Sequence, residues 1–108
     1  MTDSIVVIST CATEADAERL ARALIEARLV ACVSVVPQVR SFYRWKGQVE
    51  SVGEFLLLMK TSRESFGALS AAMEKLHPYE LPELLALPVV AGPANYLNWL
   101  AGNLGTGE

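Results

Sequence analysis

The long strand pattern on either side of Lys46-Gly47 constrains the fold of this chain more than any other feature. Strand character runs from Leu29 to Trp45, interrupted by Pro37, and it resumes after the turn signal from Gln48 to Lys60. Each arm of such a hairpin would reach on the order of 40 Å at about 3.3 Å per residue. An uncovered two-stranded ribbon is marginally stable, so we expect the tip to project and to pair with another subunit.

Two further strands are expected outside the hairpin. The continuous β-branched run from Ile5 to Ile8 predicts a central strand that is buried on both faces. The apolar segment from Leu84 to Val90 predicts a last strand, and Pro88 within it favours a position at a sheet edge. Gly53 suggests a bulge or bend in the second arm of the hairpin.

Helical spacing of apolar residues predicts three helices. They lie at about 14–28, at about 66–76 and after Gly92-Pro93. Two capping-box patterns mark the expected starts of the first two helices, namely Thr13 with Asp16 and Thr61 with Glu64.

The resulting β-α-β-β-α-β-α order predicts an α+β fold in a single domain that spans residues 1–108. Two split βαβ units give the ferredoxin-like arrangement, in which four antiparallel strands carry two helices on one face. Here an extra C-terminal helix follows. The other face of the sheet still carries apolar side chains, so we expect a partner subunit to cover it.

The balance of charged and apolar residues excludes several classes of partner. Charged residues make up 19% of the chain and hydrophobic residues 52%, so a small monomer would expose much apolar surface, which favours subunit association. A net charge of −3 argues against nucleic acid or an anionic membrane, and no apolar run is long enough for a membrane span. The N-terminus lacks the positive region of a signal peptide, so Cys11 and Cys32 are expected to be free thiols in the cytoplasm.

The segment from His77 to Glu83 combines the only histidine with two prolines, a tyrosine and two carboxylates. Its prolines forbid a helix, so a stiff loop presents these groups after the second helix. The candidate ligands of a metal site are His77, Glu80 and Glu83, and Cu²⁺ would bind there better than other common divalent ions, weakly and not as an obligatory cofactor. The competing interpretation is that His77 only bonds the free carbonyls at the end of the helix.

Aromatic and cationic residues of the hairpin form a second candidate site. A cleft between subunits could bind a small anionic metabolite, and its candidate residues are Tyr43, Arg44, Trp45, Lys46, Lys60 and Tyr79. In the competing interpretation the aromatic residues pack against a neighbouring subunit. The cations would then be solvated or would form salt bridges between subunits with Glu50 and Glu54.

Catalytic motifs are weak in this sequence. Cys11 follows the first strand near a helix N-terminus, where the helix dipole can lower the pKa of a thiol. Cys32 lies in an apolar strand and is expected in the core. The sequence has no second histidine, nucleophile elbow, phosphate-binding glycine loop or dinucleotide fingerprint, so we expect no enzyme activity.

Several motifs occur together along nearly the full chain. They are Leu29-Val30-Ala31-Cys32-Val33, Pro37, Ser41-Phe42-Tyr43-Arg44-Trp45-Lys46-Gly47, Glu50, Glu54, Lys60-Thr61, His77-Pro78-Tyr79-Glu80-Leu81-Pro82-Glu83, and Gly92 with Tyr96 and Trp99. In this combination the chain resembles the CutA family of divalent-cation tolerance proteins.

The resemblance implies a ferredoxin-like subunit in a compact homotrimer, whose hairpins pair between subunits much as in PII-like signalling trimers. It also implies a role in tolerance of copper and other divalent ions, copper binding by some members, and no catalytic reaction. His77 matches the histidine of the family's His-Pro-Tyr motif. Ser9 and Leu76 stand where members with a copper site have a cysteine and a second histidine, so the resemblance implies no tight copper(I) site here.

Overall fold

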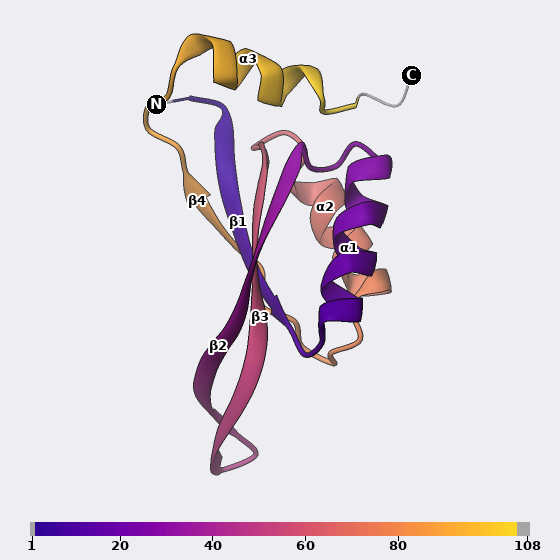
Figure 1. Cartoon of the computed structure of the whole chain (residues 1–108), viewed down its shortest axis with the longest axis vertical. Helices are drawn as coiled ribbons and strands as arrows, with labels where there is room; N and C mark the ends of the chain where they lie inside the picture. Colours follow the sequence, from indigo (N-terminus) through magenta and orange to yellow (C-terminus); the bar gives the residue numbers. More distant parts are fainter. Residues whose placement is uncertain (1, 106–108) are drawn as a thin grey trace.

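The architecture is a four-stranded antiparallel sheet of order β2-β3-β1-β4, seen in a computed structural model that describes residues 2–105. The elements in chain order are β1 (Ser4–Cys11), α1 (Glu14–Glu26), β2 (Cys32–Trp45), β3 (Gln48–Ser62), α2 (Phe66–Leu76), β4 (Leu85–Pro88) and α3 (Ala94–Gly102). Both α1 and α2 cover one face of the sheet, and α3 crosses one end of the molecule (Figure 1). This connectivity confirms the predicted ferredoxin-like α+β fold with an extra C-terminal helix.

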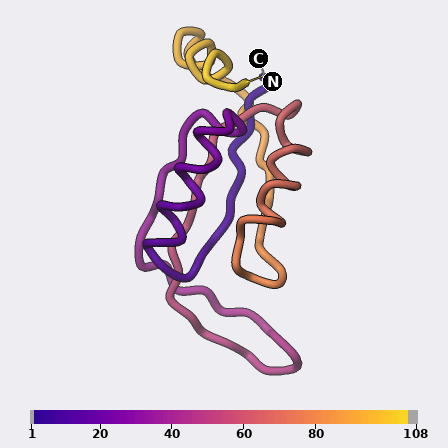
Figure 2. Tube along the Cα trace, turned by 90° about the vertical axis from the view of Figure 1, so that its right-hand side faces the viewer, coloured from indigo at the N-terminus to yellow at the C-terminus, as the bar shows by residue number. Residues whose placement is uncertain are grey.

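The central strand β1 separates a buried face of the sheet from an open one. Ile5 and Val7 are buried beneath the helices, whereas Val6 and Ile8 between them are half-buried. The second view shows α1 and α2 side by side on the same side of the sheet (Figure 2). The expectation of a strand buried on both faces is therefore wrong for the single chain. The core includes Leu20, Leu24, Leu57, Met59, Leu69 and Met73.

The long hairpin is formed by two continuous strands, because Pro37 introduces a bulge instead of ending β2. The pairing of β2 with β3 shifts between Val36 and Val39, and Gln38 adopts a left-handed φ of 62°. The bulge thus lies on the first arm. Gly53, where a bend was expected on the second arm, keeps a regular pairing.

The tip of the hairpin is a tight turn at Lys46 and Gly47, whose φ angles are 51° and 82°. Positive φ at both central residues is typical of a type I′ turn, whose twist matches that of the flanking strands. Beyond the bulge most side chains are exposed, and the ribbon projects away from the helices (Figure 1). The projecting hairpin is therefore confirmed.

The two expected capping boxes have different outcomes. Thr13 caps α1, since its hydroxyl accepts a hydrogen bond of 3.0 Å from the backbone N–H of Asp16. The prediction for Thr61 is wrong, because β3 extends through this residue and its buried hydroxyl donates to the carbonyl of Leu29 at 2.7 Å. The residue before α2 is Ser65, whose side chain makes no capping hydrogen bond.

The face of the sheet opposite α1 and α2 is apolar and poorly covered. β4 is an edge strand beside β1, as Pro88 suggested, and its Leu85 and Leu87 are 58% and 49% exposed. Val36 of β2 is exposed as well. No helix within residues 2–105 is long and apolar enough to span a membrane.

Candidate functional site

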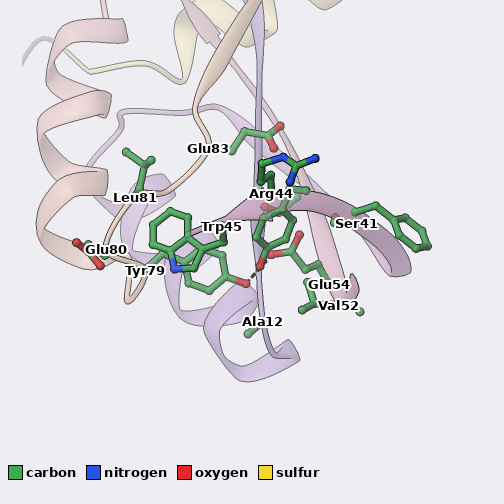
Figure 3. Close-up of a pocket in the computed structure, with 14 residues that line it drawn as sticks. Ala12, Ser41, Arg44, Trp45, Val52, Glu54, Tyr79, Glu80, Leu81 and Glu83 are labelled. Carbon is green, nitrogen blue, oxygen red and sulfur yellow. Dashed lines mark hydrogen bonds between the residues drawn. The ribbon is translucent and has the colours of Figure 1, made fainter. Parts of the chain in front are cut away.

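A cleft of about 870 Å³ lies between the projecting part of the hairpin, the end of β1 and the loop that follows α2. Six residues expected from the sequence line it, namely Tyr43, Arg44, Trp45, Tyr79, Glu80 and Glu83 (Figure 3). Three expected residues do not line it, namely Lys46, Lys60 and His77. The structure thus joins parts of the two candidate sites into one cleft.

The loop after α2 is positioned by the first residues that follow the helix. His77 has extended backbone with ψ of 135°, as expected for a residue before proline, so the chain leaves the helix axis at this point. The imidazole Nε2 lies 2.7 Å from the carbonyl oxygen of Thr10 at the end of β1. The backbone N–H of Tyr79 donates to Nδ1 at 3.1 Å. These bonds hold the loop against β1 and bring Tyr79 into the cleft.

His77 is buried, with 6% of its surface exposed, and both of its ring nitrogens are engaged. Because Nδ1 accepts a hydrogen bond, we assign the proton to Nε2, which donates to Thr10. The competing interpretation of His77 as a residue that bonds carbonyls is thus close to what is seen, although the carbonyl belongs to a strand and not to α2. In this conformation neither nitrogen offers a free lone pair to a metal.

The expected metal site stays a prediction. Among residues 2–105, no three or more His, Cys, Asp or Glu side chains are grouped so that they could hold a metal ion. Glu80 and Glu83 are exposed residues of the cleft wall, and His77 lies behind Tyr79, with the two ring centroids 4.7 Å apart.

Glu54 is the cleft residue that the sequence did not single out as a ligand group. Its side chain is only 5% exposed, and the hydroxyl of Tyr79 donates to its Oε2 at 2.5 Å (Figure 3). Burial raises the pKa of the Tyr79 phenol, and the hydrogen bond to the Glu54 carboxylate raises it further. The phenol therefore stays protonated and acts as a donor. The sequence had named Glu54 only as a salt-bridge partner and as a family motif residue, because a carboxylate on an exposed hairpin arm is expected to be solvated.

The charge of the cleft differs from the one expected for an anion site. Three carboxylates line it, those of Glu54, Glu80 and Glu83, against the single guanidinium of Arg44. Lys46 lies in the hairpin turn. Lys60 lies elsewhere on the sheet, where its ammonium donates to the hydroxyl of Ser34 at 2.7 Å. A single chain thus gives the cleft an excess of negative charge.

The two cysteines are free thiols. Cys11 is fully buried at the end of β1, and its thiol donates to the carbonyl of Thr13 at 3.6 Å. Burial raises the pKa of the Cys11 thiol, and the nearby Asp16 carboxylate adds to the increase. The net direction is thus opposite to the lowering that a helix dipole could have produced. Cys32 is half-buried beside Lys60 and does not lie in the core cluster.

Comparisons with known proteins agree on one family. The family model described as "CutA1 divalent ion tolerance protein" matches residues 5–103. The divalent-cation tolerance protein CutA of Thermus thermophilus is 46% identical over 100 residues, which cover 93% of this chain and 97% of that protein.

Solved structures give the same result. The Thermus thermophilus divalent cation tolerance protein has a TM-score of 0.92 at 45% identity, with 94% of this chain and 99% of that chain covered. The Archaeoglobus fulgidus structure, which is described as a periplasmic divalent cation tolerance protein CutA, has a TM-score of 0.90 at 31% identity, with 93% and 97% covered. On the family match and on these likenesses, the chain belongs to the CutA family of divalent-ion tolerance proteins.

Proposed function

We propose that this protein acts in tolerance of, or response to, divalent metal ions such as copper, as a non-enzymatic homotrimer that binds these ions weakly. The observation that carries this proposal is the negatively charged cleft, in which Glu54, Glu80 and Glu83 outnumber the single cation Arg44. Hard and borderline divalent cations prefer such carboxylate ligands. Family membership supports the link to divalent-ion tolerance.

The proposed metal ligands are Glu80 and Glu83 of the cleft wall together with His77 behind it. To ligate through Nδ1, the imidazole would have to release the backbone N–H of Tyr79. Losing a hydrogen bond of this kind costs about 0.5–1.5 kcal/mol, and more if the donor stays buried and unpaired. Binding is therefore weak, and Cu²⁺ is favoured among divalent ions by the general affinity order.

The proposed homotrimer is supported by surface that a single chain leaves open. Leu85 and Leu87 of β4 are about half exposed, and Phe42 and Val49 on the hairpin are 67% and 68% exposed. Exposed apolar surface of this extent is typical of subunit interfaces. Sedimentation at micromolar concentration tests the proposal, and a well-folded single subunit under these conditions would contradict it.

The absence of catalysis is proposed from the chemistry of the cleft. In the cleft the Tyr79 phenol, which donates to Glu54, has a raised pKa, and the buried thiol of Cys11 at the end of β1 has a raised pKa as well. Neither group is activated as a nucleophile near pH 7. The proposed location is the cytoplasm, which two free thiols support.

The alternative function is a PII-like sensor of a small anionic metabolite in a cleft between subunits. The volume of about 870 Å³ and the aromatic walls suit a small organic ligand. The charge of the cleft counts against an anion, because cations from other subunits would have to outweigh three carboxylates.

Calorimetric titration of the assembled protein with Cu²⁺ tests the metal-binding proposal. We expect Glu83→Gln and His77→Ala each to weaken Cu²⁺ binding several-fold, while Glu74→Gln on the exposed side of α2 leaves it unchanged. Circular dichroism checks that the His77 variant keeps its fold. Equal affinity for Cu²⁺ in the wild type and both cleft variants would remove these residues from the metal site.

A further inference from the structure

The carboxylate of Glu54 is buried without a cation to balance it. Its side chain is 5% exposed, and within residues 2–105 its hydrogen bonding is limited to the Tyr79 hydroxyl on Oε2. The ion pairs Arg19–Asp16 and Arg22–Glu18 lie on α1 and do not involve Glu54. A buried carboxylate with one neutral donor is unfavourable, because the donor replaces only part of its lost hydration. The second oxygen, Oε1, is free to accept a hydrogen bond from a ligand.

Three aromatic side chains share the cleft with this carboxylate. Trp45, Tyr43 and Tyr79 line the same cleft as Glu54, and Trp45 and Tyr43 are 38% and 44% exposed. In the close-up the hydroxyl of Tyr79 points to Glu54 (Figure 3). The faces of such rings carry negative potential that attracts cations, and they offer apolar surface against which an alkyl chain can pack.

The rest of the cleft strengthens the preference for a positive ligand. Glu80 and Glu83 add two carboxylates to its wall, and the guanidinium of Arg44 reaches back to the turn carbonyl of Gly47 at 3.5 Å. A volume of about 870 Å³ is far larger than a single metal ion requires. The combination of buried carboxylate, aromatic faces and acidic rim is suited to an organic cation with an apolar chain.

We propose that the cleft binds a primary alkylammonium ion, whose ammonium group donates to the free oxygen of Glu54 while its methylene chain lies against Trp45 and Tyr43. In a diamine the second ammonium faces Glu80 and Glu83. This site uses the cleft of the proposed function but requires neither a metal ion nor a rearrangement of His77.

A set of matched four-carbon probes tests the ligand class. The assembled protein is titrated by calorimetry with 1,4-diaminobutane, butylamine, butan-1-ol and butyrate at pH 7, where both amines are protonated. We expect the diamine to bind most tightly, butylamine next, and the alcohol and the carboxylate at least about 10-fold more weakly. A Trp99→Phe background, which removes the exposed tryptophan of α3, lets fluorescence report on Trp45.

Two variants that each remove one carboxylate charge test whether Glu54 binds the ammonium group. Glu54→Gln should weaken diamine binding about 10-fold or more, because a charge-assisted hydrogen bond is lost. The matched control is Glu50→Gln, an exposed residue of the same strand outside the cleft, which should leave the affinity unchanged. If Glu54→Gln fails to fold, the ratio of the affinities of the wild-type protein for butylamine and butan-1-ol still tests whether the cleft prefers an ammonium group.

Three results would overturn the proposal. They are butan-1-ol or butyrate binding as tightly as the amines, diamine binding that Glu54→Gln does not change, and no diamine binding at millimolar concentration. The last result, combined with Cu²⁺ binding that depends on Glu83, would reject the alkylammonium site and leave the proposed metal function intact.

Discussion

The two halves of the β2–β3 hairpin are built from the same strands but have opposite environments. On the helix side of the bulge, Leu57 and Met59 are fully buried under α1 and α2. On the tip side, Phe42 and Val49 are more than 60% exposed. The comparison shows that the inner half stabilises the fold of one chain, whereas the outer half carries surface available to a cleft ligand or to another subunit.

The bulge at Pro37 and Gln38 separates the two halves. A bulge increases the local twist, so the faces of the outer ribbon turn relative to those of the inner sheet. Glu54 stands at this boundary, opposite Val39, the first β2 residue after the shift. At this position Tyr79 of the loop after α2 contacts the residue, and Glu54 is buried although it belongs to the projecting arm.

The largest expected effect lies in the inner half. Leu57→Ala should lower the free energy of unfolding by about 2–5 kcal/mol, since it opens a cavity at a fully buried position of the core. Denaturant-induced unfolding at fixed protein concentration measures the change. A loss below about 1 kcal/mol would show that the inner half contributes less to the fold than its burial indicates.

At the boundary, Tyr79→Phe should lower stability by about 1–3 kcal/mol near neutral pH, because it leaves the Glu54 carboxylate buried without its donor. The raised pKa of the phenol also predicts a pH dependence. The folded protein holds this proton more tightly than the unfolded chain, so the stabilisation is complete below about pH 10 and decreases as the pH rises above it.

Unfolding measured from pH 8 upward checks this prediction. The wild type should lose stability above about pH 10 relative to Tyr79→Phe, in which this titration is absent. Parallel pH profiles for the two proteins would mean that the Tyr79–Glu54 contact does not persist in solution.

In the outer half, Val49→Asp should leave the circular dichroism spectrum unchanged and weaken assembly by about 10-fold, or about 1.4 kcal/mol. The residue is 68% exposed in one chain, so a charge there costs the isolated subunit little. Sedimentation over a concentration series measures the dissociation. Unchanged assembly would place the subunit interface away from this part of the ribbon.

The smallest effects are expected at the two helix starts. Thr13→Ala should cost about 1 kcal/mol through loss of the cap on α1, and Ser65→Ala before α2 should cost less than about 0.5 kcal/mol. Thermal unfolding of both variants compares them directly. A larger loss for Ser65→Ala would contradict the absence of a side-chain cap there.

Local patterns predicted most of the fold but not its junctions. The turn at Lys46-Gly47 and the cap at Thr13 were predictable, because each depends on residues adjacent in sequence. Pro37 and Thr61 were misjudged for the same physical reason. Pairing with β3 continues β2 past Pro37, and the pairing of Thr61 with Ile5 of β1 continues β3, whereas the local patterns favoured a strand end and the start of a helix.

The candidate site was predicted in part. Tyr43, Trp45, Tyr79 and the two carboxylates of the loop do share a cleft, but the expected cations Lys46 and Lys60 do not reach it in one chain. Glu54 was missed as a cleft residue because its burial results from a loop 25 positions further along the chain.

The amino-acid sequence by itself determined the order of strands and helices, the length of the hairpin and the family, since periodicity, turn residues and motifs are properties of neighbouring positions. Only the tertiary structure decided that His77 holds a loop against Thr10 and that Tyr79 donates to Glu54. The first contact joins residues that are 67 positions apart in sequence, and the second joins residues that are 25 positions apart. Both therefore exist only after the sheet and α2 have packed together.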